Sequence, residues 1–200
     1  MTKTIGIVLY PDFEELDAIG PYEVFGMFSN VSAGEWQVVN IAESVGPVRS
    51  HSGLRIVADH SFDDAPPLDV ILVPGGLGSR AAVTNKRLVD FVTRAAADAE
   101  WQTSVCTGAL ILHECGILNG KKATTHWGAI DALRQLPDVK VIDDQRYVRD
   151  GNVITSAGVS AGIDMALYLV SLLKDSQTAQ NVQKMMEYYP KPPTFEKAPA

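Results

Sequence analysis

Short apolar runs alternate with longer amphipathic segments along the chain. Strands that are buried on both faces read as continuous hydrophobic stretches, so these runs predict the strands of a parallel sheet. We predict strands at residues 5–10, 36–42, 70–73, 103–105, 122–125 and 139–142. The turn signals Ser52-Gly53 and Asp150-Gly151-Asn152 predict two hairpins, which pair 48–50 with 54–58 and 147–149 with 153–155.

Apolar positions three or four residues apart predict helices between the strands. The first helix has this spacing from Leu16 to Phe28, and Gly20-Pro21 fits its first turn. Further helices are predicted at 85–98, 107–115, 127–135, 162–174 and 177–188, followed by an extended tail from about residue 190. Strands that alternate with helices predict one α/β domain over residues 1–200, a three-layer sandwich with a mostly parallel central sheet. In such a sheet, ligands bind at the carboxyl ends of the strands.

Composition and charge narrow the classes of function. The 200 residues are 46% hydrophobic and 20% charged, which is typical of a globular chain and not of a disordered one. The net charge of −7 gives no general attraction to phosphate, so we expect no nucleic-acid or anionic-membrane partner. No apolar run approaches the ~18 residues of a membrane span, and residues 1–4 lead directly into a strand. We therefore expect a cytoplasmic protein.

The two cysteines, Cys106 and Cys115, are expected to be unpaired. They lie nine residues apart in a segment with a helical pattern, which separates them by about 13 Å along the helix axis. A disulfide needs Cα atoms within about 7 Å of each other. Two free thiols are typical of a reducing compartment.

Of the two cysteines, Cys106 is the stronger candidate for a reactive residue. It follows the strand at 103–105 and opens the next helix with no loop between, so the backbone must turn sharply and present the thiol above the sheet. The small residues Ser104 and Gly108 permit such a turn. A helix start favours the thiolate, which is the nucleophilic form of cysteine. Cys115, at the far end of this helix, is expected to be a core residue.

Asp17 is a candidate acid because it lies near the start of the helix that follows the first strand. A carboxylic acid beside a thiolate is pushed toward its protonated form, which makes it a proton shuttle. A helix N-cap is the simpler explanation of an aspartate at this position. Glu14 and Glu15 lie on the same segment, and spacing does not separate the three carboxylates.

Paired glycines follow the strand at 70–73. Gly75 and Gly76 let backbone N–H groups approach a substrate closely, and the N–H of Thr107 points the same way at the start of its helix. Together these donors predict a hole that stabilises developing negative charge. An ordinary turn after an apolar strand explains paired glycines as well.

His126 and Gly158 follow two further predicted strands. His126 fits a Cys/His pair with Cys106, and it fits a structural histidine equally well. Gly158 would let the backbone approach the same cleft. The other three histidines have no ligand-like spacing, so no metal site is expected.

Several segments together resemble a known family. They are Tyr10-Pro11-Asp12-Phe13, Val73-Pro74-Gly75-Gly76 and the elbow Ser104-Val105-Cys106-Thr107-Gly108. These segments resemble the ThiJ/PfpI superfamily, whose members fold as a flavodoxin-like α/β sandwich. Further segments are similar to the isocyanide hydratases within it: Leu16-Asp17, Gly20-Pro21, Ala123-Thr124-Thr125-His126-Trp127, Ala161-Gly162-Ile163-Asp164, and Glu187-Tyr188 through Pro192-Pro193. The likeness runs from Ile5 to Phe195.

The chain differs from several sibling families. Thr107 follows Cys106 where the PfpI-type peptidases have histidine, and Asp17 stands where many superfamily members use glutamate. The His-x-Glu tripeptide of class I glutamine amidotransferases does not occur. AraC-type regulators share the Asp17 and Thr-Thr-His-Trp features, but they need a DNA-binding domain, and about 25 residues follow Lys174. These differences disfavour a peptidase, an amidotransferase or a regulator.

The resemblance implies hydration of an isocyanide to an N-substituted formamide. It implies that Cys106 is a nucleophile that forms a thioimidate, that Asp17 is the acid, and that Thr107, Gly75 and Gly76 supply donors, with no cofactor. It also implies a homodimer and a small, neutral organic substrate. Two other functions stay open: a glyoxalase- or deglycase-like enzyme for reactive carbonyls, and a non-enzymatic small-molecule or oxidation sensor based on Cys106.

Overall fold

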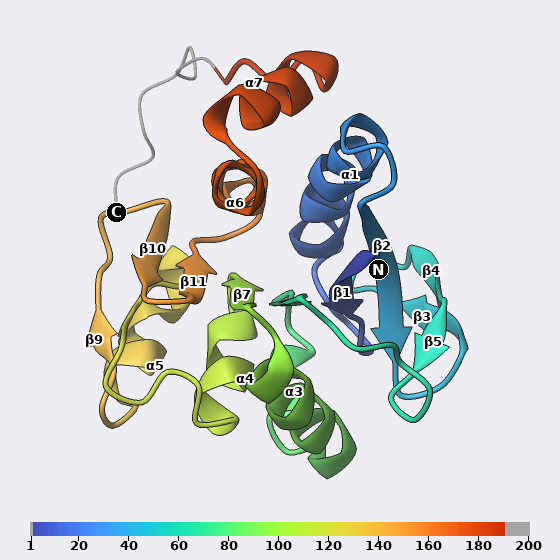
Figure 1. Cartoon of the computed structure of the whole chain (residues 1–200). Coiled ribbons are helices and arrows are strands. Elements are labelled where there is room, and N and C mark those ends of the chain that lie inside the picture. The colour runs from blue at the N-terminus through green and yellow to red at the C-terminus, as the bar shows by residue number, and fades with distance from the viewer. Residues whose placement is uncertain (1, 191–200) are drawn as a thin grey trace.

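The computed structural model describes residues 2–190 and confirms an α/β sandwich with a mostly parallel sheet (Figure 1). The strands are β1 (Lys3–Val8), β2 (Trp36–Ala42), β3 (Gly46–Arg49), β4 (Arg55–Ala58), β5 (His60–Ser61), β6 (Val70–Val73), β7 (Trp101–Val105), β8 (Lys122–Ala123), β9 (Lys140–Val141), β10 (Tyr147–Asp150) and β11 (Val153–Ser156). The helices are α1 (Glu15–Val31), α2 (Ser79–Ala82), α3 (Lys86–Asp98), α4 (Gly108–Glu114), the 3-10 helix η1 (Trp127–Ala129), α5 (Ile130–Arg134), α6 (Ala161–Leu173) and α7 (Ser176–Met185). After Pro190, the predicted tail lies outside the described residues.

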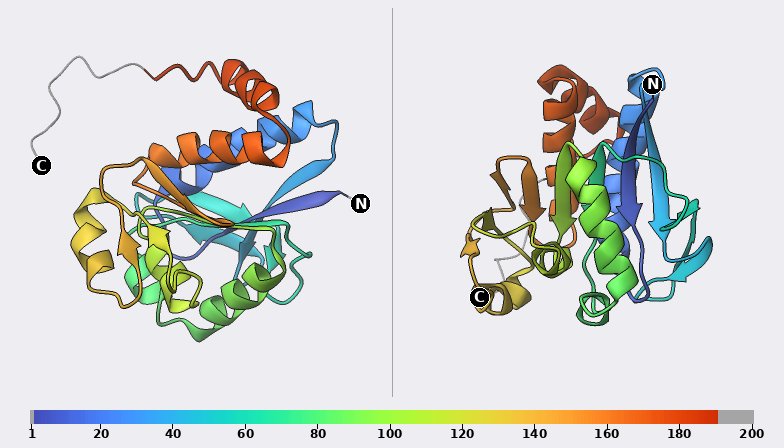
Figure 2. Two further views of the ribbon diagram at one scale, coloured as in Figure 1. Left: turned by 60° about the vertical axis from the view of Figure 1, so that its left-hand side comes forward. Right: turned by 60° about the horizontal axis from the view of Figure 1, so that its bottom comes forward.

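The central sheet has seven strands in the order β10-β11-β7-β6-β1-β2-β5. All neighbouring pairs are parallel except β10 and β11, which form the predicted hairpin at one edge. Helices α1, α6 and α7 cover one face of the sheet, and α3 and α4 cover the other (Figure 1 and Figure 2). Because β1, β6, β7 and β11 are parallel neighbours, the loops that follow them meet at one end of the sheet. Within the described part of the chain, no helix combines the length and hydrophobicity of a membrane span.

The predicted strands agree with the structure in the middle of the central sheet and differ from it at the periphery. Strands β2 and β6 match their predicted bounds, since apolar side chains buried on both faces leave a continuous signal. The strand predicted at 122–125 is wrong beyond Ala123, and β8 pairs with β9 in a separate small sheet. Thr124 and Thr125 leave the strand because they bond elsewhere. The N–H of Thr124 donates to Oγ1 of Thr155, and the hydroxyl of Thr125 donates to the Cys106 carbonyl.

The prediction that Gly20-Pro21 forms a first helical turn is also wrong. Helix α1 begins at Glu15, so Pro21 lies inside it, where it removes one backbone hydrogen bond. Tertiary packing explains why the helix tolerates this. A Cβ at Gly20 would lie 2.9 Å from Cγ1 of Ile163, so α6 approaches α1 more closely than another residue would permit. The early start of α1 is what brings Asp17 into the helix.

Candidate active site

The backbone at Cys106 makes the sharp turn that the sequence predicted. Cys106 lies between β7 and α4 with a φ angle of 55°, in the left-handed region that is strained for a residue other than glycine. Its N–H donates to the carbonyls of Ser156 and Ala157, each 3.1 Å away, which holds the turn against the end of β11. The residue is only 7% exposed. The strained elbow is confirmed, and it is buried.

Asp17 faces Cys106 from α1, and the N-cap explanation of this residue is wrong. Glu14 occupies the cap position and makes no side-chain cap bond. The Asp17 carboxylate instead accepts the N–H of Gly75 at Oδ2 (2.9 Å) and the N–H of Val159 at Oδ1 (3.1 Å). Its charge also acts on the Cys106 thiol and raises the pKa of that thiol. Asp17 therefore joins the loops that follow β6 and β11, and its carboxylate acts on the elbow after β7.

The neighbouring glutamates have other positions. Oε1 of Glu15 accepts the hydroxyl of Ser50 and the N–H of Ser52, so this carboxylate is committed to the β3–β4 hairpin. The N–H of Glu14 donates to the carbonyl of Gly75 at 2.8 Å, and its side chain is half-buried. The structure therefore distinguishes the three carboxylates, which sequence spacing could not do. It is Asp17 that acts on the thiol.

Burial controls the protonation of the Asp17–Cys106 pair. Burial, opposed by the Gly75 N–H, raises the pKa of Asp17 from 3.8 to about 7. Burial and then the Asp17 charge raise the pKa of the Cys106 thiol from 9.0 to about 12. The Thr107 N–H at the start of α4 lowers the thiol pKa, as the helix start was expected to do, but burial and the Asp17 charge outweigh it. Near pH 7 the Cys106 thiol therefore keeps its proton, and the Asp17 carboxyl is about half ionised.

The glycine loop holds the acid and Thr107 in place. The N–H of Gly75 is used by Asp17, and the N–H of Gly76 donates to Oγ1 of Thr107 at 3.0 Å. Neither glycine N–H is therefore the free donor that the sequence predicted for an anion hole. The backbone N–H of Thr107 lowers the pKa of the Cys106 thiol, against the larger effect of burial. A Cβ at Gly75 would lie 2.5 Å from this nitrogen, so the close approach itself requires glycine.

Tyr10 is a buried residue of the site that the sequence reasoning did not single out. It lies directly after β1 and is 4% exposed. Its hydroxyl donates to the carbonyl of Pro74 at 2.7 Å. Burial, with the charges of Asp17 and Cys106, raises the pKa of this phenol well above its usual value, so it stays a neutral donor. The signal that could have found it is its place at the carboxyl end of a central strand.

His126 does not pair with Cys106 in the described structure. Its Nδ1 accepts the N–H of Gly128 at 3.1 Å, which caps η1. Its ring lies against Gly158, where a Cβ would be 2.1 Å from Cδ2. The two residues are thus brought together as packing partners. Of the two explanations that the sequence left open for His126, this geometry supports the structural one.

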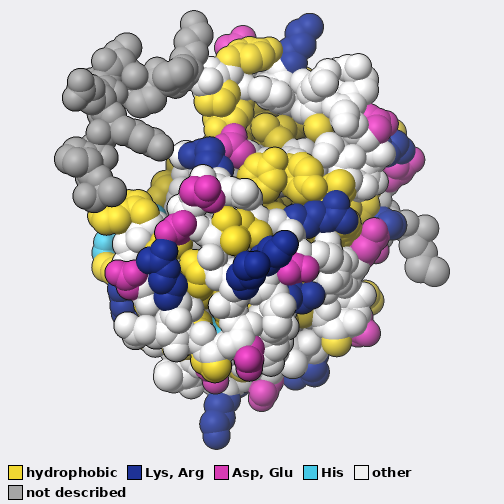
Figure 3. Space-filling model, turned by 90° about the vertical axis from the view of Figure 1, so that its left-hand side faces the viewer, with side chains coloured by type: hydrophobic (Ala, Val, Ile, Leu, Met, Phe, Trp, Pro, Cys, Tyr) yellow, Lys and Arg dark blue, Asp and Glu magenta, His cyan; other side chains and the backbone are white. Residues whose placement is uncertain are grey.

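Arg146 holds the loop that carries Val159. Its carbonyl accepts the N–H of Ala157 at 2.8 Å. Its side chain donates to Oγ of Ser160 at 3.3 Å and forms an ion pair with Asp164 at the start of α6. The face that carries β10, shown in Figure 3, has charged side chains of both signs among hydrophobic ones. The loop that orients the acid is therefore fixed from the outer face of the molecule.

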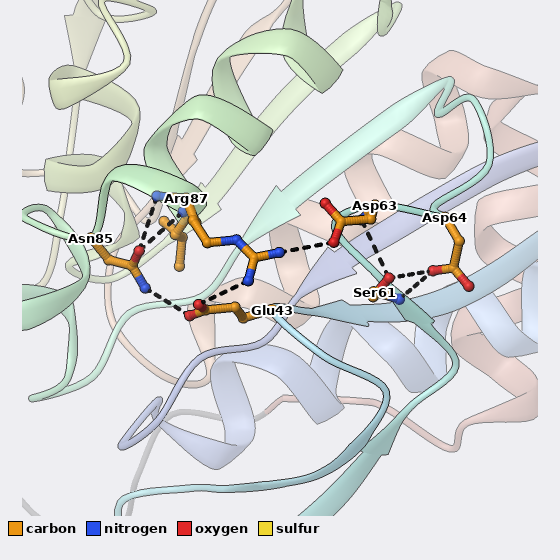
Figure 4. A network of polar contacts seen from close by, with 7 residues as sticks. Glu43, Ser61, Asp63, Asp64, Asn85 and Arg87 are labelled. Atoms are coloured by element: carbon orange, nitrogen blue, oxygen red, sulfur yellow. Dashed lines mark hydrogen bonds and ion pairs between the residues drawn. The ribbon is translucent and has the colours of Figure 1, made fainter.

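A cavity of about 600 Å³ opens beside the site. Tyr10 forms part of its wall, whereas Cys106 does not line it. A polar network lies along its rim (Figure 4): Arg87 donates to Glu43 at 3.4 Å and to Asp63 at 2.9 Å. These contacts join the loop after β2 to the start of α3. In residues 2–190, no cluster of three or more histidine, cysteine, aspartate or glutamate side chains could hold a metal ion.

Comparisons with known proteins agree with the α/β fold. Residues 3–172 match the DJ-1/PfpI family. The chain belongs to this family. It is 44% identical over 193 residues to the isonitrile hydratase of Pseudomonas putida, which covers 96% of this chain and 82% of that protein. The resemblance to the ThiJ/PfpI superfamily is thereby confirmed.

The chain is also similar to a solved structure of the same family and to a transcriptional regulator. The crystal structure of a ThiJ/PfpI family protein from Pseudomonas syringae has a TM-score of 0.89 and 38% identity, covering 98% of this chain and 78% of that one. The HTH-type transcriptional regulator GbdR of Pseudomonas aeruginosa is 26% identical over 189 residues. The match covers 93% of this chain and 51% of the regulator's length.

Proposed function

We propose that this protein hydrates isocyanides to N-substituted formamides, with Cys106 as nucleophile and Asp17 as proton shuttle. The observation that carries the proposal is the buried Asp17–Cys106 pair on a strained elbow. The similarity to the Pseudomonas putida isonitrile hydratase supports the choice of substrate. An isocyanide is a small, neutral molecule, so a buried site that contains the Asp17 carboxyl suits it better than it suits an anion.

The first step forms a thioimidate. The Cys106 sulfur attacks the terminal isocyanide carbon while Asp17 takes the thiol proton and delivers it to the same carbon. The S–H bond breaks, and S–C and C–H bonds form, which leaves a Cys106–S–CH=N–R adduct and an ionised Asp17. A carboxyl with a pKa of about 7 is suited to both accepting and donating this proton near neutral pH.

The second step hydrolyses the adduct. Asp17 accepts a proton from water as the water oxygen attacks the thioimidate carbon, and the proton passes to the nitrogen. The C–S bond then breaks, the carbonyl forms, and the thiol recovers its proton as the formamide R–NH–CHO leaves. The Thr107 N–H lowers the pKa of the Cys106 thiol, so it stabilises the negative charge that develops on the sulfur. No step calls for a cofactor.

Cys106→Ala, compared with Cys115→Ala as a matched control, tests the proposal. Cys115 lies at the far end of α4, so its replacement is expected to retain turnover of an aliphatic isocyanide. Cys106→Ala is expected to abolish formamide production, measured by chromatography. Mass spectrometry of acid-quenched wild type should find the adduct on the peptide that contains Cys106. Comparable turnover by Cys106→Ala would overturn the mechanism.

A glyoxalase- or deglycase-like activity is the second candidate. The chain is 30% identical over 196 residues to Drosophila melanogaster protein DJ-1alpha, another member of the wider family. A parallel screen with methylglyoxal and an isocyanide separates the two activities, and a sensor turns over neither.

We also propose that the protein forms a homodimer through α1 and the β3–β4 hairpin. Leu16 and Tyr22 on α1 are 36% and 41% exposed, and Leu54 beside β4 is 46% exposed. Grouped exposed apolar side chains favour an interaction site. Tyr22→Glu is expected to convert a dimer to a monomer in light scattering, whereas Met185→Glu on α7 leaves it dimeric. A monomeric wild type contradicts this proposal.

We place the protein in the cytoplasm. Cys106 and Cys115 are both free thiols, which fits a reducing compartment. Fractionation of cells that express the untagged protein tests this location, and recovery from the membrane or periplasmic fraction would contradict it.

A further inference from the structure

One peptide group connects Tyr10 to Asp17. The Tyr10 hydroxyl donates to the carbonyl oxygen of Pro74 at 2.7 Å. The nitrogen on the other side of the same peptide bond belongs to Gly75, and it donates to Oδ2 of Asp17 at 2.9 Å. Both hydrogen bonds are buried, and Tyr10 and Asp17 are 4% and 0% exposed. A phenol, a peptide and a carboxylate therefore form one continuous chain of hydrogen bonds.

The second oxygen of Asp17 is held in the same way. Its Oδ1 accepts the N–H of Val159 at 3.1 Å, and the carbonyl of that peptide, on Gly158, accepts the N–H of Ala161 at 3.2 Å. The Gly158 carbonyl therefore has its hydrogen-bond partner in the backbone at the start of α6. The Pro74 carbonyl, on the peptide that binds the other Asp17 oxygen, accepts a side-chain donor, the Tyr10 hydroxyl. Of these two peptide groups, only the Pro74–Gly75 group can thus lose that partner through a side-chain substitution.

We propose that Tyr10 is a positioning residue for Asp17 that acts through the Pro74–Gly75 peptide group. Hydrogen bonds in a chain polarise one another, so a donor on the Pro74 carbonyl makes the Gly75 N–H a stronger donor to the carboxylate. The same contact fixes the plane of the peptide, which sets the direction of the N–H. The role of Tyr10 in catalysis rests on the proposed function. Its effect on the pKa of the Asp17 carboxylate does not depend on that function.

The groups that act on Asp17 are few and can be named. They are Glu14 at the start of its own helix, Cys106 from the elbow after β7, and Tyr10 from the loop after β1. The loop before α6 supplies the Val159 backbone. Because Tyr10 stays neutral, it contributes polarity to this set and no charge. Removing its hydroxyl therefore weakens the stabilisation of ionised Asp17 without changing the number of charges.

Tyr10→Phe, read by infrared titration of the carboxyl band, tests the inference directly. The band is assigned by its absence in Asp17→Asn. We expect the midpoint for Asp17 in Tyr10→Phe to rise by roughly half a pH unit, about a threefold gain in proton affinity. The matched control is Tyr147→Phe, which removes the hydroxyl of a different tyrosine, one whose ring stacks on Tyr168. It is expected to leave the midpoint unchanged.

A second variant covers the case in which Tyr10→Phe does not fold. A fluorinated tyrosine at position 10 keeps the ring and the hydroxyl but makes the hydroxyl a stronger donor, so the Asp17 midpoint is expected to fall. Opposite shifts in the two variants are a result that a general packing defect does not produce. An unchanged midpoint in the fluorinated variant overturns the inference. The titration uses no isocyanide, so its outcome is independent of whether the proposed hydration occurs.

Discussion

The thiol of Cys106 and the carboxylate of Asp17 are both buried, and the charge of the carboxylate acts on the thiol. Burial raises the pKa of Asp17 to about 7, and burial together with the Asp17 charge raises that of Cys106 to about 12. Near pH 7 the resting pair is therefore a neutral thiol beside a carboxyl that is about half ionised. The carboxylate acts first as a base in such a pair, and it becomes an acid only after it has taken the thiol proton.

Asp17→Asn is expected to make Cys106 easier to ionise while abolishing hydration. The substitution removes the negative charge that opposes the thiolate, whereas the burial that also opposes it remains. We expect alkylation of Cys106 by iodoacetamide near pH 8 to quicken on the order of tenfold. The rate is followed by mass spectrometry of the Cys106 peptide. An unchanged rate would mean that the two groups do not interact.

The free energy of unfolding is expected to fall as the pH rises from about 4 to about 7. Burial raises the pKa of Asp17 from 3.8 to about 7, so the folded state binds a proton in this range that the unfolded state has released. Linkage gives at most about 4 kcal/mol for this difference, lost across that window. Urea unfolding of wild type and Asp17→Asn at about pH 5 and about pH 8 measures it. The variant should lack this part of the slope.

Thr107→Val is expected to reduce turnover at least tenfold, and Thr107→Ser to retain most of it. Oγ1 of Thr107 accepts the N–H of Gly76 and the hydroxyl of Ser79, and it donates to the Gly76 carbonyl. Valine has a similar shape but leaves these buried groups without a partner, at a cost of about 1–3 kcal/mol each. Steady-state kinetics and thermal unfolding are measured together. Equal activity in the two variants would show that the hydroxyl is dispensable.

His126→Asn is expected to keep most of the activity. The asparagine carbonyl can accept the Gly128 N–H that Nδ1 of His126 accepts, so the start of η1 remains capped. His126→Ala removes the cap and is expected to cost about 1 kcal/mol of stability with little change in kcat. Urea unfolding and isocyanide turnover distinguish the two effects. A large loss of kcat in His126→Asn would restore the Cys/His pair as an explanation.

The predictable features of the site come from short-range constraints. Cys106 was identified because a strand passes directly into a helix there, and only a strained backbone can make that connection. Asp17 could not be separated from Glu14 and Glu15, because adjacent carboxylates differ in direction and not in sequence spacing. The partners of its carboxylate, Gly75 and Val159, lie 58 and 142 residues away along the chain.

By itself, the sequence determined the alternation of strands and helices, the family, and which cysteine stands at the elbow, since hydrophobic periodicity and local backbone geometry are encoded by neighbouring residues. Only the tertiary structure decided that the glycine N–H groups are occupied, that His126 is a packing partner of Gly158, and that Tyr10 reaches Asp17 through a peptide group. It also decided the protonation of the pair. Desolvation depends on every element that covers a group, and no local pattern records it.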